Sequence, residues 1–337
     1  MRQKLPPCGS EEKSRFPSGR GLHASEDDVP RRDFLKRVCA LPIGLATAQQ
    51  VSSALAAEKT EAALPQIPFG RYSISRLIVG SNPFHAGSHL SVFVNHEMRT
   101  YYTTEQKMKT LRRCQEVGIN CWQGSDNHQE TYRQFRDQGG KMHYFSLGSD
   151  GPEAGNYLKK LADVGCVGVA HHGEITDSLF KAGKLDQIHD YLKRVRDTGM
   201  MVGVSTHMPD VVDAVESKGW DVDFYMTCVY QRHRSAKELE QLLGQAPISV
   251  GEVYLPSDPP RMFKAVRQTK RPCFAFKILA AGRLSERSEW VEQAFRQTFE
   301  GIKPTDAVII GLYDRYSDQQ AENAAFTRRF SPLSGKA

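Results

Sequence analysis

The feature that most constrains the fold is a regular alternation of short apolar runs and amphipathic stretches from about residue 66 onward. Short apolar runs indicate buried strands, and the periodic stretches between them indicate helices that cover a sheet. The predicted strands are 77–79, 119–122, 143–146, 167–170, 201–204, 222–227, 273–279 and 307–310. The predicted helices are 104–117, 127–138, 154–164, 184–198, 208–217, 235–243, 287–300 and 317–329.

Eight strand–helix units in succession predict an α/β fold, a parallel (β/α)8 TIM barrel. An open doubly wound sheet is the alternative, but no Gly-x-Gly-x-x-Gly motif opens the first unit. Residues 247–269 form a long connection with a predicted helix of its own, 259–268, and we expect a flap over one side of the barrel mouth. Residues 88–96 are expected to form a long loop, whose His89 and His96 lie at the surface or cap the cleft.

The first 57 residues differ from the barrel region and resemble a targeting segment. Residues 1–30 are polar and rich in Pro, Gly and Ser, which predicts a disordered n-region. The sequence RRDFLK begins at Arg31 and precedes a weakly apolar run and a small-x-small site, so residues 31–57 resemble a cleavable twin-arginine export signal. Pro42 and several polar residues interrupt the run, and we therefore expect no stable membrane anchor. The alternatives are a chance arginine pair in a disordered tail and a true start near Val29.

The export signal implies a partner and a location. The partner is the twin-arginine translocase, and the mature barrel, residues 58–337, is then periplasmic or extracellular. Proteins that use this route cross the membrane folded, often with a cofactor already inserted. The resemblance therefore favours a bound cofactor.

Charge and cysteine content narrow the remaining classes of protein. The net charge of +6 falls to +3 once residues 1–57, with nine Lys and Arg and six Asp and Glu, are set aside. A charge this small gives no reason to expect nucleic acid or an anionic membrane as a partner. The seven cysteines form no Cys-x-x-Cys pair. Those that fall in or beside predicted strands are expected to be buried thiols: Cys121, Cys166, Cys228 and Cys273.

Several short motifs follow one another in the order in which they occur in the aldo-keto reductases. They are residues 67–80, 118–120, 203–205, 221–225, 275–282 and 307–311, followed by Glu322 and Asn323. The first of these resembles the short hairpin and first strand that begin that family. The resemblance covers nearly all of residues 58–337, and it implies a TIM barrel that uses NAD(P)H to reduce a carbonyl compound.

The catalytic residues of that family are only partly present here. Gln123 and His128 stand where the family has its aspartate and its tyrosine, and Asp126 is placed to compensate in part. The third predicted strand carries no lysine at its end. His171 matches the histidine that orients the substrate. Because successive side chains of a strand point to opposite faces, we expect His171, and not His172, to project into the barrel.

The resemblance also implies contacts to NAD(P). Ser205 and Phe276 match the positions beside the nicotinamide, and Leu279 to Gly282 matches the loop that wraps the pyrophosphate. Backbone amides at a glycine-rich helix start bind phosphate without any catalytic side chain. The cofactor-binding residues implied in this way are Ser205, Phe276, Leu279, Gly282, Arg283, Gly311, Arg315, Glu322 and Asn323.

Histidines and carboxylates follow several of the predicted strands, where the active sites of barrels lie. His172 and His207, with Glu174 nearby, are candidate ligands for a divalent metal. Two imidazoles and a carboxylate suit zinc, iron or manganese and leave a position open for substrate. A metal site is therefore the alternative to NAD(P).

Lys277 lies in an otherwise apolar strand, where an unpaired lysine is costly to bury. One interpretation is a general base or a Schiff-base amine with a lowered pKa. The other is a lysine at the exposed end of the strand that pairs with a carboxylate such as Glu252. Both interpretations stay open at this point.

Two enzyme classes and one binding function remain. The first is an exported oxidoreductase that keeps NAD(P) and uses His128 and His171 on a sugar or another small carbonyl compound. The second is a non-redox lyase, isomerase or hydrolase that uses the histidine cluster, with or without a metal. The third is a binding protein that recognises sugars without turning them over. Each requires a small-molecule ligand in the barrel mouth.

Overall fold

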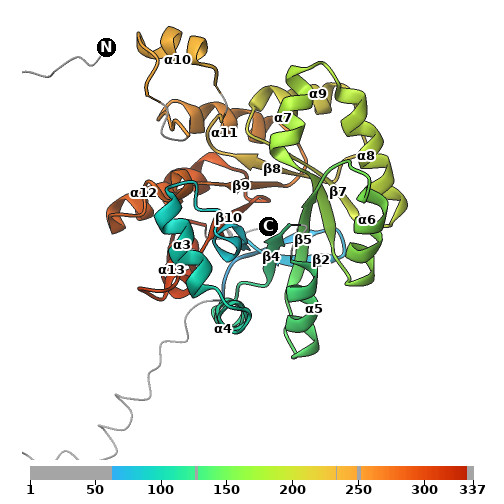
Figure 1. The fold of residues 1–337 in the computed structure, drawn as a ribbon, viewed down its shortest axis with the longest axis vertical. Helices are drawn as coiled ribbons and strands as arrows, with labels where there is room; N and C mark the ends of the chain where they lie inside the picture. Colours follow the sequence, from blue (N-terminus) through green and yellow to red (C-terminus); the bar gives the residue numbers. More distant parts are fainter. Residues whose placement is uncertain (1–62, 126–127, 233, 249–251, 332–337) are drawn as a thin grey trace, which may run out of the picture. The chain divides into compact units, whose positions relative to one another are not determined.

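The computed structural model describes residues 63–125, 128–232, 234–248 and 252–331, so the predicted n-region and export signal lie outside the described residues. Eight parallel strands form a closed barrel, in which β10 pairs with both β9 and β3 (Figure 1). Each predicted strand overlaps an observed one, which confirms the (β/α)8 barrel. The strands are β3 (Leu77–Gly80), β4 (Cys121–Gly124), β5 (His143–Gly148), β6 (Gly168–His171), β7 (Met201–Thr206), β8 (Phe224–Cys228), β9 (Cys273–Phe276) and β10 (Ala307–Gly311).

An outer ring of helices covers the barrel, and most of these helices bury an apolar stripe against it. In α8, the buried residues are Ile188, Tyr191, Leu192 and Val195, the i, i+3, i+4, i+7 spacing of a single helical face. The ring consists of α4 (Thr104–Glu116), α5 (Gln129–Asp137), α6 (Ala154–Asp163), α8 (Leu185–Asp197), α9 (Pro209–Ser217), α11 (Asp258–Gln268), α12 (Ser288–Gly301) and α13 (Gln319–Phe330).

The helix between β8 and β9 differs from the prediction. Helix α11 packs between α9 and α12 and buries Met262, Phe263, Ala265 and Val266. Helix α10 (Ala236–Leu243) buries Leu239 alone among its eight residues and protrudes from the ring in Figure 1. The prediction that made 235–243 the ring helix and assigned 259–268 to a flap was therefore wrong. The longer apolar stripe of α11 decides which helix covers the barrel.

Two α-helices and a 3-10 helix were not predicted. The expected long loop after the first strand contains a 3-10 helix, η1 (Asn82–His85), and a full helix, α3 (Val92–Tyr101). Helix α7 (Gly173–Lys181) follows β6 directly. Helix α3 buries Met98 alone among its ten residues, and the buried residues of α7 include the polar Thr176 and Asp177. Neither helix therefore shows the apolar periodicity that predicts a helix from sequence.

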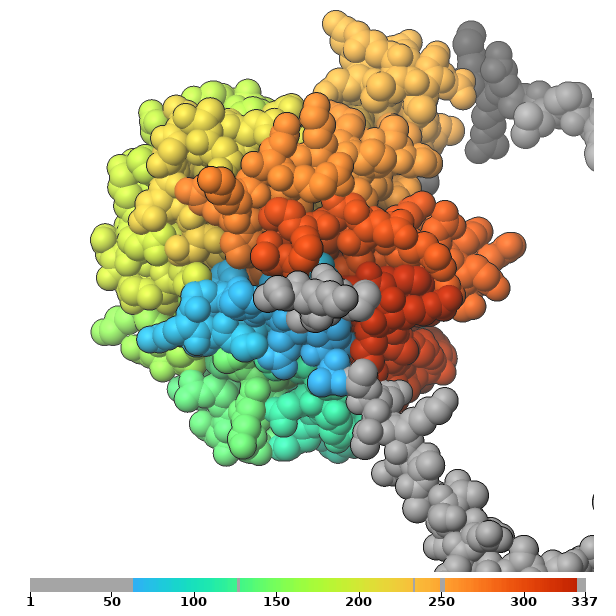
Figure 2. All heavy atoms as spheres, turned by 180° about the vertical axis from the view of Figure 1, so that it is seen from behind, coloured from blue at the N-terminus to red at the C-terminus, as the bar shows by residue number. Residues whose placement is uncertain are grey.

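The amino end of the barrel is closed by the hairpin of β1 (Gln66–Phe69) and β2 (Tyr72–Ser75), as the resemblance implied. Figure 2, which shows the molecule from behind, has this hairpin in blue at its centre. The ring of Phe69 packs against Phe145, Phe224 and Phe274 inside the barrel, with centroids 5.4–5.5 Å apart. The lumen is therefore filled with side chains at this end, and the opposite end is left for ligands.

The interior fits the remaining predictions about the core. Cys121, Cys166, Cys228 and Cys273 are buried free thiols, as predicted.

Among the described residues, no helix is both long enough and apolar enough to span a membrane.

Candidate active site

A cluster of polar side chains surrounds the carboxylate of Glu252 at the carboxyl ends of β8 and β9. The Lys277 Nζ lies 3.1 Å from Oε1 and 3.2 Å from Oε2 of Glu252. The His89 Nδ1 lies 3.1 Å from Oε1. The hydroxyl of Tyr230 donates to Oε2, and the Nε of Arg232 contacts Oε1. Glu252 therefore joins four side chains from three separate segments of the chain, and these five residues are called the Glu252 cluster below.

The register of the barrel brings Tyr230 and Lys277 together. Strands β8 and β9 are parallel neighbours in which Cys228 stands opposite Phe276. The backbone N–H of Val229 donates to the carbonyl of Phe276 at 3.1 Å. Lys277 directly follows its strand and Tyr230 follows two residues after its own, so both side chains emerge at the barrel mouth. The Lys277 ammonium also lies 5.8 Å from the centroid of the Tyr230 ring.

Burial sets the charges of this cluster. The side chains of Lys277 and Glu252 are each 9% exposed and that of Arg232 is 14% exposed. Burial lowers the pKa of Lys277, and the charge of Arg232 adds to this, although Glu252 opposes it. Burial by itself would raise the pKa of Glu252, but the His89 hydrogen bond and the charge of Lys277 outweigh burial and hold this pKa below its ordinary range. The carboxylate therefore stays ionised beside an amine that releases its proton more readily than an exposed lysine.

The backbone that carries Lys277 is strained. Lys277, Ala280 and Ala281 have φ values of 60°, 49° and 55°, in the left-handed region that residues with a side chain seldom adopt. Turn hydrogen bonds hold them there, including one of 2.8 Å from the Ala280 N–H to the Lys277 carbonyl. Strain of this kind persists where the surroundings impose it, and it concentrates at functional sites.

A buried histidine–carboxylate pair lies on the neighbouring strand end. The His207 Nδ1–H donates to Oδ2 of Asp177 at 2.7 Å, and the His207 backbone N–H donates to the same oxygen at 3.1 Å. The Thr206 hydroxyl donates to Oδ1 of Asp177 at 2.5 Å. Because a carboxylate only accepts, Nδ1 of His207 carries the proton and Nε2 is the basic nitrogen. Burial lowers the pKa of His207, and Asp177 opposes this without cancelling it, so the imidazole is neutral at pH 7.

The dyad of Asp177 and His207 adjoins the Glu252 cluster. The His207 ring packs edge-on against Phe276, the residue before Lys277, with ring centroids 5.4 Å apart. The charges of Lys277 and Arg232 act on the His207 pKa. The two groups therefore line one side of the mouth, which we call the lysine side.

His171 does not project into the barrel, and the orientation predicted for it was wrong. Its neighbour Val169 faces the helices, whereas Ala170 faces the lumen. The His171 ring packs on Tyr191 of α8 at 5.2 Å, and its Nδ1 lies 2.7 Å from the Thr176 hydroxyl of α7. Burial lowers the pKa of His171 to about 4. The side chain is therefore a neutral part of the layer between strands and helices.

The other catalytic residues predicted from the family lie away from the Glu252 cluster. His128 is 1% exposed, and its ring packs against Trp122 and His85 with centroids 5.6 and 5.4 Å away. Burial lowers the pKa of His128 to about 3. The amide of Gln123 donates to the next carbonyl along its own chain, that of Gly124. Asp126 lies outside the described residues.

The candidate metal ligands do not form a metal site. Within the described residues, no group of three or more His, Cys, Asp and Glu side chains is arranged to hold a metal ion. Nδ1 of His207 is engaged by Asp177, and the carboxylate of Glu174 lies 3.7 Å from Nη1 of Arg232. His172 is the residue before α7 begins. The set of His172, His207 and Glu174 is therefore not assembled, and no step below is assigned to a metal.

The loop matched to the NAD(P) pyrophosphate is covered by other parts of the chain. Arg283 donates to the backbone carbonyls of Ala280 and His89 at 2.8 and 3.2 Å. A Cβ on Gly282 would meet the Leu90 side chain at 3.1 Å, so Leu90 rests on this turn. Leu279 packs against the outer core. These residues do not form an open cradle for a pyrophosphate.

The residues matched to the adenosine end also contact protein groups. Arg315 donates to Glu97 at 2.5 Å, and Pro83 lies about 3.0 Å from where a Cβ of Gly311 would be. Glu322 accepts from Ser317 at 3.3 Å. Asn323 is buried in α13, and Ser205 is buried on β7. In this arrangement, most of the residues that the resemblance assigns to a dinucleotide contact other protein groups.

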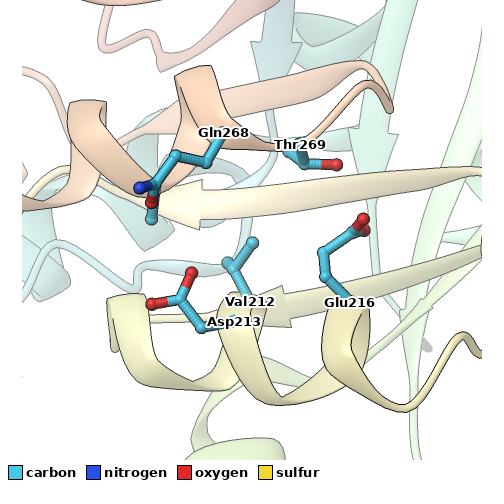
Figure 3. A pocket seen from close by; sticks show the side chains of 6 residues that line it. Val212, Asp213, Glu216, Gln268 and Thr269 are labelled. Atoms are coloured by element: carbon cyan, nitrogen blue, oxygen red, sulfur yellow. The ribbon is translucent and has the colours of Figure 1, made fainter.

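A separate pocket of about 270 Å³ lies between α9 and α11 (Figure 3). Its residue Glu216 is held by Arg271 Nη1 at 2.7 Å and by the Tyr225 hydroxyl at 2.6 Å. The pocket lies toward the carboxyl ends of its helices, which corresponds to the amino ends of the strands. Polar groups at that end of a TIM barrel contribute to stability rather than to catalysis.

Comparison with known proteins selects no function. No protein-family model matches the sequence, and no curated protein matches it. Similar solved structures include a truncated 3-deoxy-D-arabino-heptulosonate 7-phosphate synthase from Thermotoga maritima, with 12% identity, 80% of this chain and 91% of that chain covered, and a TM-score of 0.45. They also include the glycerol dehydrogenase from Gluconobacter oxydans, with 10% identity, coverages of 79% and 96%, and a TM-score of 0.43. A third is the N-acetylmannosamine-6-phosphate 2-epimerase from Clostridium perfringens, with 10% identity, coverages of 75% and 91%, and a TM-score of 0.41.

Sequence reasoning had not singled out Arg232 or Asp177. Arg232 stands four residues after the end of β8, and this position at a strand's carboxyl end was the signal that could have found it. Asp177 lies in α7, which has no apolar periodicity, so no signal pointed to it. The predicted pairing of Lys277 with Glu252 is confirmed, but the strand end is not exposed, because the Lys277 side chain is only 9% exposed. His89 contacts the same carboxylate.

Proposed function

We propose that this protein is a non-redox enzyme, a lyase or isomerase, that acts on a small carbonyl compound through an imine with Lys277. The observation that carries the proposal is a buried lysine with a lowered pKa on strained backbone at the carboxyl end of a barrel strand. A neutral amine is the nucleophile in imine formation, and burial is a standard way to supply it near pH 7. The proposal belongs to the same class as the non-redox alternative from the sequence.

The proposed reaction begins with attack by the neutral Lys277 amine on the substrate carbonyl carbon. A C–N bond forms, and the carbonyl oxygen takes up protons and leaves as water, which produces an iminium ion. The adjacent C–H or C–C bond then breaks, and its electron pair moves into the iminium. This gives an enamine, while the proton passes to a base or the cleaved fragment departs. The enamine then takes up a proton at carbon to regenerate the iminium ion, and water hydrolyses it to release the carbonyl product and restore the amine.

His207 is the proposed proton acceptor when a C–H bond breaks. Asp177 fixes the tautomer in which Nε2 is basic, and burial keeps the ring neutral and ready to accept a proton. Tyr230 stays protonated because burial raises its pKa, so its hydroxyl is a hydrogen-bond donor beside the reacting amine. Glu252 holds both Tyr230 and Lys277 and is therefore proposed as a positioning residue.

The oxidoreductase prediction and NAD(P) binding rest on the family resemblance and stay predictions. The residues that the resemblance assigns to the cofactor contact other protein groups, which supports the non-redox alternative. A fluorescence titration with NADP(H) tests the cofactor directly. An exported enzyme that needs no diffusible redox cofactor also fits the proposed periplasmic or extracellular location.

Export itself is tested by cell fractionation. We propose that the full chain reaches the periplasm or medium and that a variant with Arg31→Lys and Arg32→Lys stays in the cytoplasm, because the twin-arginine translocase reads the arginine pair. A variant that is exported equally well contradicts this part of the proposal.

The experiment for the proposed chemistry is solvent exchange at carbon. The protein is incubated in D2O with pyruvate, dihydroxyacetone or xylose, and loss of the C–H signal next to the carbonyl is followed by proton NMR. Imine formation acidifies that position, so we expect exchange above the buffer rate with at least one compound. Lys277→Met is expected to abolish it and His171→Leu to leave it unchanged. Exchange that survives in Lys277→Met contradicts the proposal.

A further inference from the structure

A second pocket lies outside the barrel, between α11 and α12, and the proposed function does not use it. Its volume is about 270 Å³, slightly below the usual range for sites that hold drug-sized ligands. Tyr254, Phe263 and Trp290 line it, together with Pro256 and Pro259. Trp290 is 38% exposed, so part of its indole is accessible to a ligand.

The side of the pocket formed by α12 presents the indole of a tryptophan beside the side-chain amides of two glutamines. Trp290, Gln293 and Gln297 all line it and stand at i, i+3 and i+7, so they share one face of that helix. The Arg287 guanidinium lies 4.9 Å from the centroid of the Trp290 ring and fixes the orientation of the indole. The pocket therefore offers an aromatic surface beside side chains that both donate and accept hydrogen bonds.

None of the described residues that line the pocket is charged, so the lining does not favour a phosphate, a carboxylate or a metal ion. Proline and aromatic walls favour a flat ring, and the amides favour polar atoms at one edge of it. We infer that this pocket binds an uncharged planar heteroaromatic ring, such as a nucleobase. Stacking on aromatic side chains is a general means of holding such rings.

The pocket shares a wall with the active site. Ile278 follows Lys277, Val229 precedes Tyr230, and both line the pocket. The Tyr254 ring also packs edge-on against Tyr230, with centroids 5.4 Å apart. The pocket itself is built from residues outside the Glu252 cluster, so binding there does not depend on the Lys277 chemistry.

Calorimetric titration of the full chain with adenosine tests this inference, with ribose as the matched probe that lacks the ring. We expect one adenosine site per chain and no heat from ribose. Trp290→Ala is expected to weaken binding about tenfold or more, because the stacking surface is lost. Gln293→Ala is expected to weaken binding by a smaller factor.

Two variants serve as controls. Trp220→Phe changes an indole that is stacked on His189 at 4.6 Å, and we expect it to leave adenosine affinity unchanged. Lys277→Met is expected to leave it unchanged as well, which separates this site from the proposed function. The absence of adenosine binding at millimolar concentration, or unchanged affinity in Trp290→Ala, overturns the inference. If Trp290→Ala does not fold, Gln293→Ala combined with Trp290→Phe is used, and unchanged affinity there overturns it equally.

Discussion

Two groups of polar residues near the carboxyl ends of the strands are held in opposite ways: the lysine side lines the barrel mouth, whereas His128 and His171, called the histidine side, are buried away from the Glu252 cluster. On the histidine side, His128 and His171 are buried among aromatic rings, and burial lowers their pKa values to about 3 and 4. On the lysine side, Lys277 and Arg232 are buried around one carboxylate, that of Glu252. Neutral imidazoles buried in this way support the fold, whereas the compensated cluster of charges at the strand ends is where we propose that the chemistry lies. The number of histidines near strand ends is therefore a poor guide to where the chemistry lies.

Removing the Glu252 carboxylate should cause the largest loss of stability. Glu252→Leu leaves Lys277 and Arg232 buried without their partner, and we expect a loss of about 3–5 kcal/mol in the free energy of unfolding. Urea unfolding measures this. Glu174→Gln is the matched control, because its carboxylate is half exposed and 3.7 Å from Arg232, and its expected loss is below about 1 kcal/mol. Equal losses in the two variants would show that the lysine side is not a compensated cluster.

Disrupting the dyad of Asp177 and His207 should have the next largest effect on stability. Asp177→Asn removes the charged acceptor from His207 and Thr206, and we expect a loss of about 2 kcal/mol in stability. The same change removes what fixes the tautomer of His207, so carbon exchange should fall by about a hundredfold or more. Full exchange activity in a folded Asp177→Asn protein would remove His207 from the proposed reaction.

Mild acid should act on the histidine side through the pH dependence of stability. An unfolded histidine takes up a proton below about pH 6.5, whereas folded His171 does so only near pH 4, so stability falls as the pH drops from 6.5 toward 4. The expected slope for one such histidine is about 1.4 kcal/mol per pH unit. Urea unfolding at several pH values should therefore show a shallower slope in His171→Leu than in the wild type. Identical slopes would mean that His171 is not held neutral by burial.

The fold was predictable because its signals are local and repeated. Eight apolar runs with periodic stretches between them sufficed for the barrel, and the hairpin was found from its own motif. The errors fall where periodicity is absent or ambiguous. Helix α7 buries polar residues, so it has no apolar periodicity. Two predicted helices, α10 and α11, lie between β8 and β9, and the sequence did not show that α11 is the one that covers the barrel.

The site was only partly predictable because its contacts join distant segments. Lys277 and Glu252 are 25 positions apart, and their pairing was proposed because a buried lysine needs a counter-charge. No comparable argument existed for Asp177, which meets His207 across 30 positions. His171 was predicted to face the lumen, but it faces the helices. Two adjacent histidines do not show which of them points inward, and an error of one residue in the strand's alternation reverses the direction of the side chain.

Reductive trapping tests the central claim most directly, namely that Lys277 is the reactive group of the barrel mouth. The protein is treated with whichever of the three carbonyl compounds supports exchange, together with cyanoborohydride, and the modified lysine is identified by peptide mass mapping. Lys303 is the matched control, because it is also partly buried and pairs with a carboxylate, Asp306, at 3.0 Å, but lies before β10. We predict that Lys277 carries the reduced adduct well ahead of Lys303 and the exposed lysines. Label spread over exposed lysines, with Lys277 unmodified, would contradict the account.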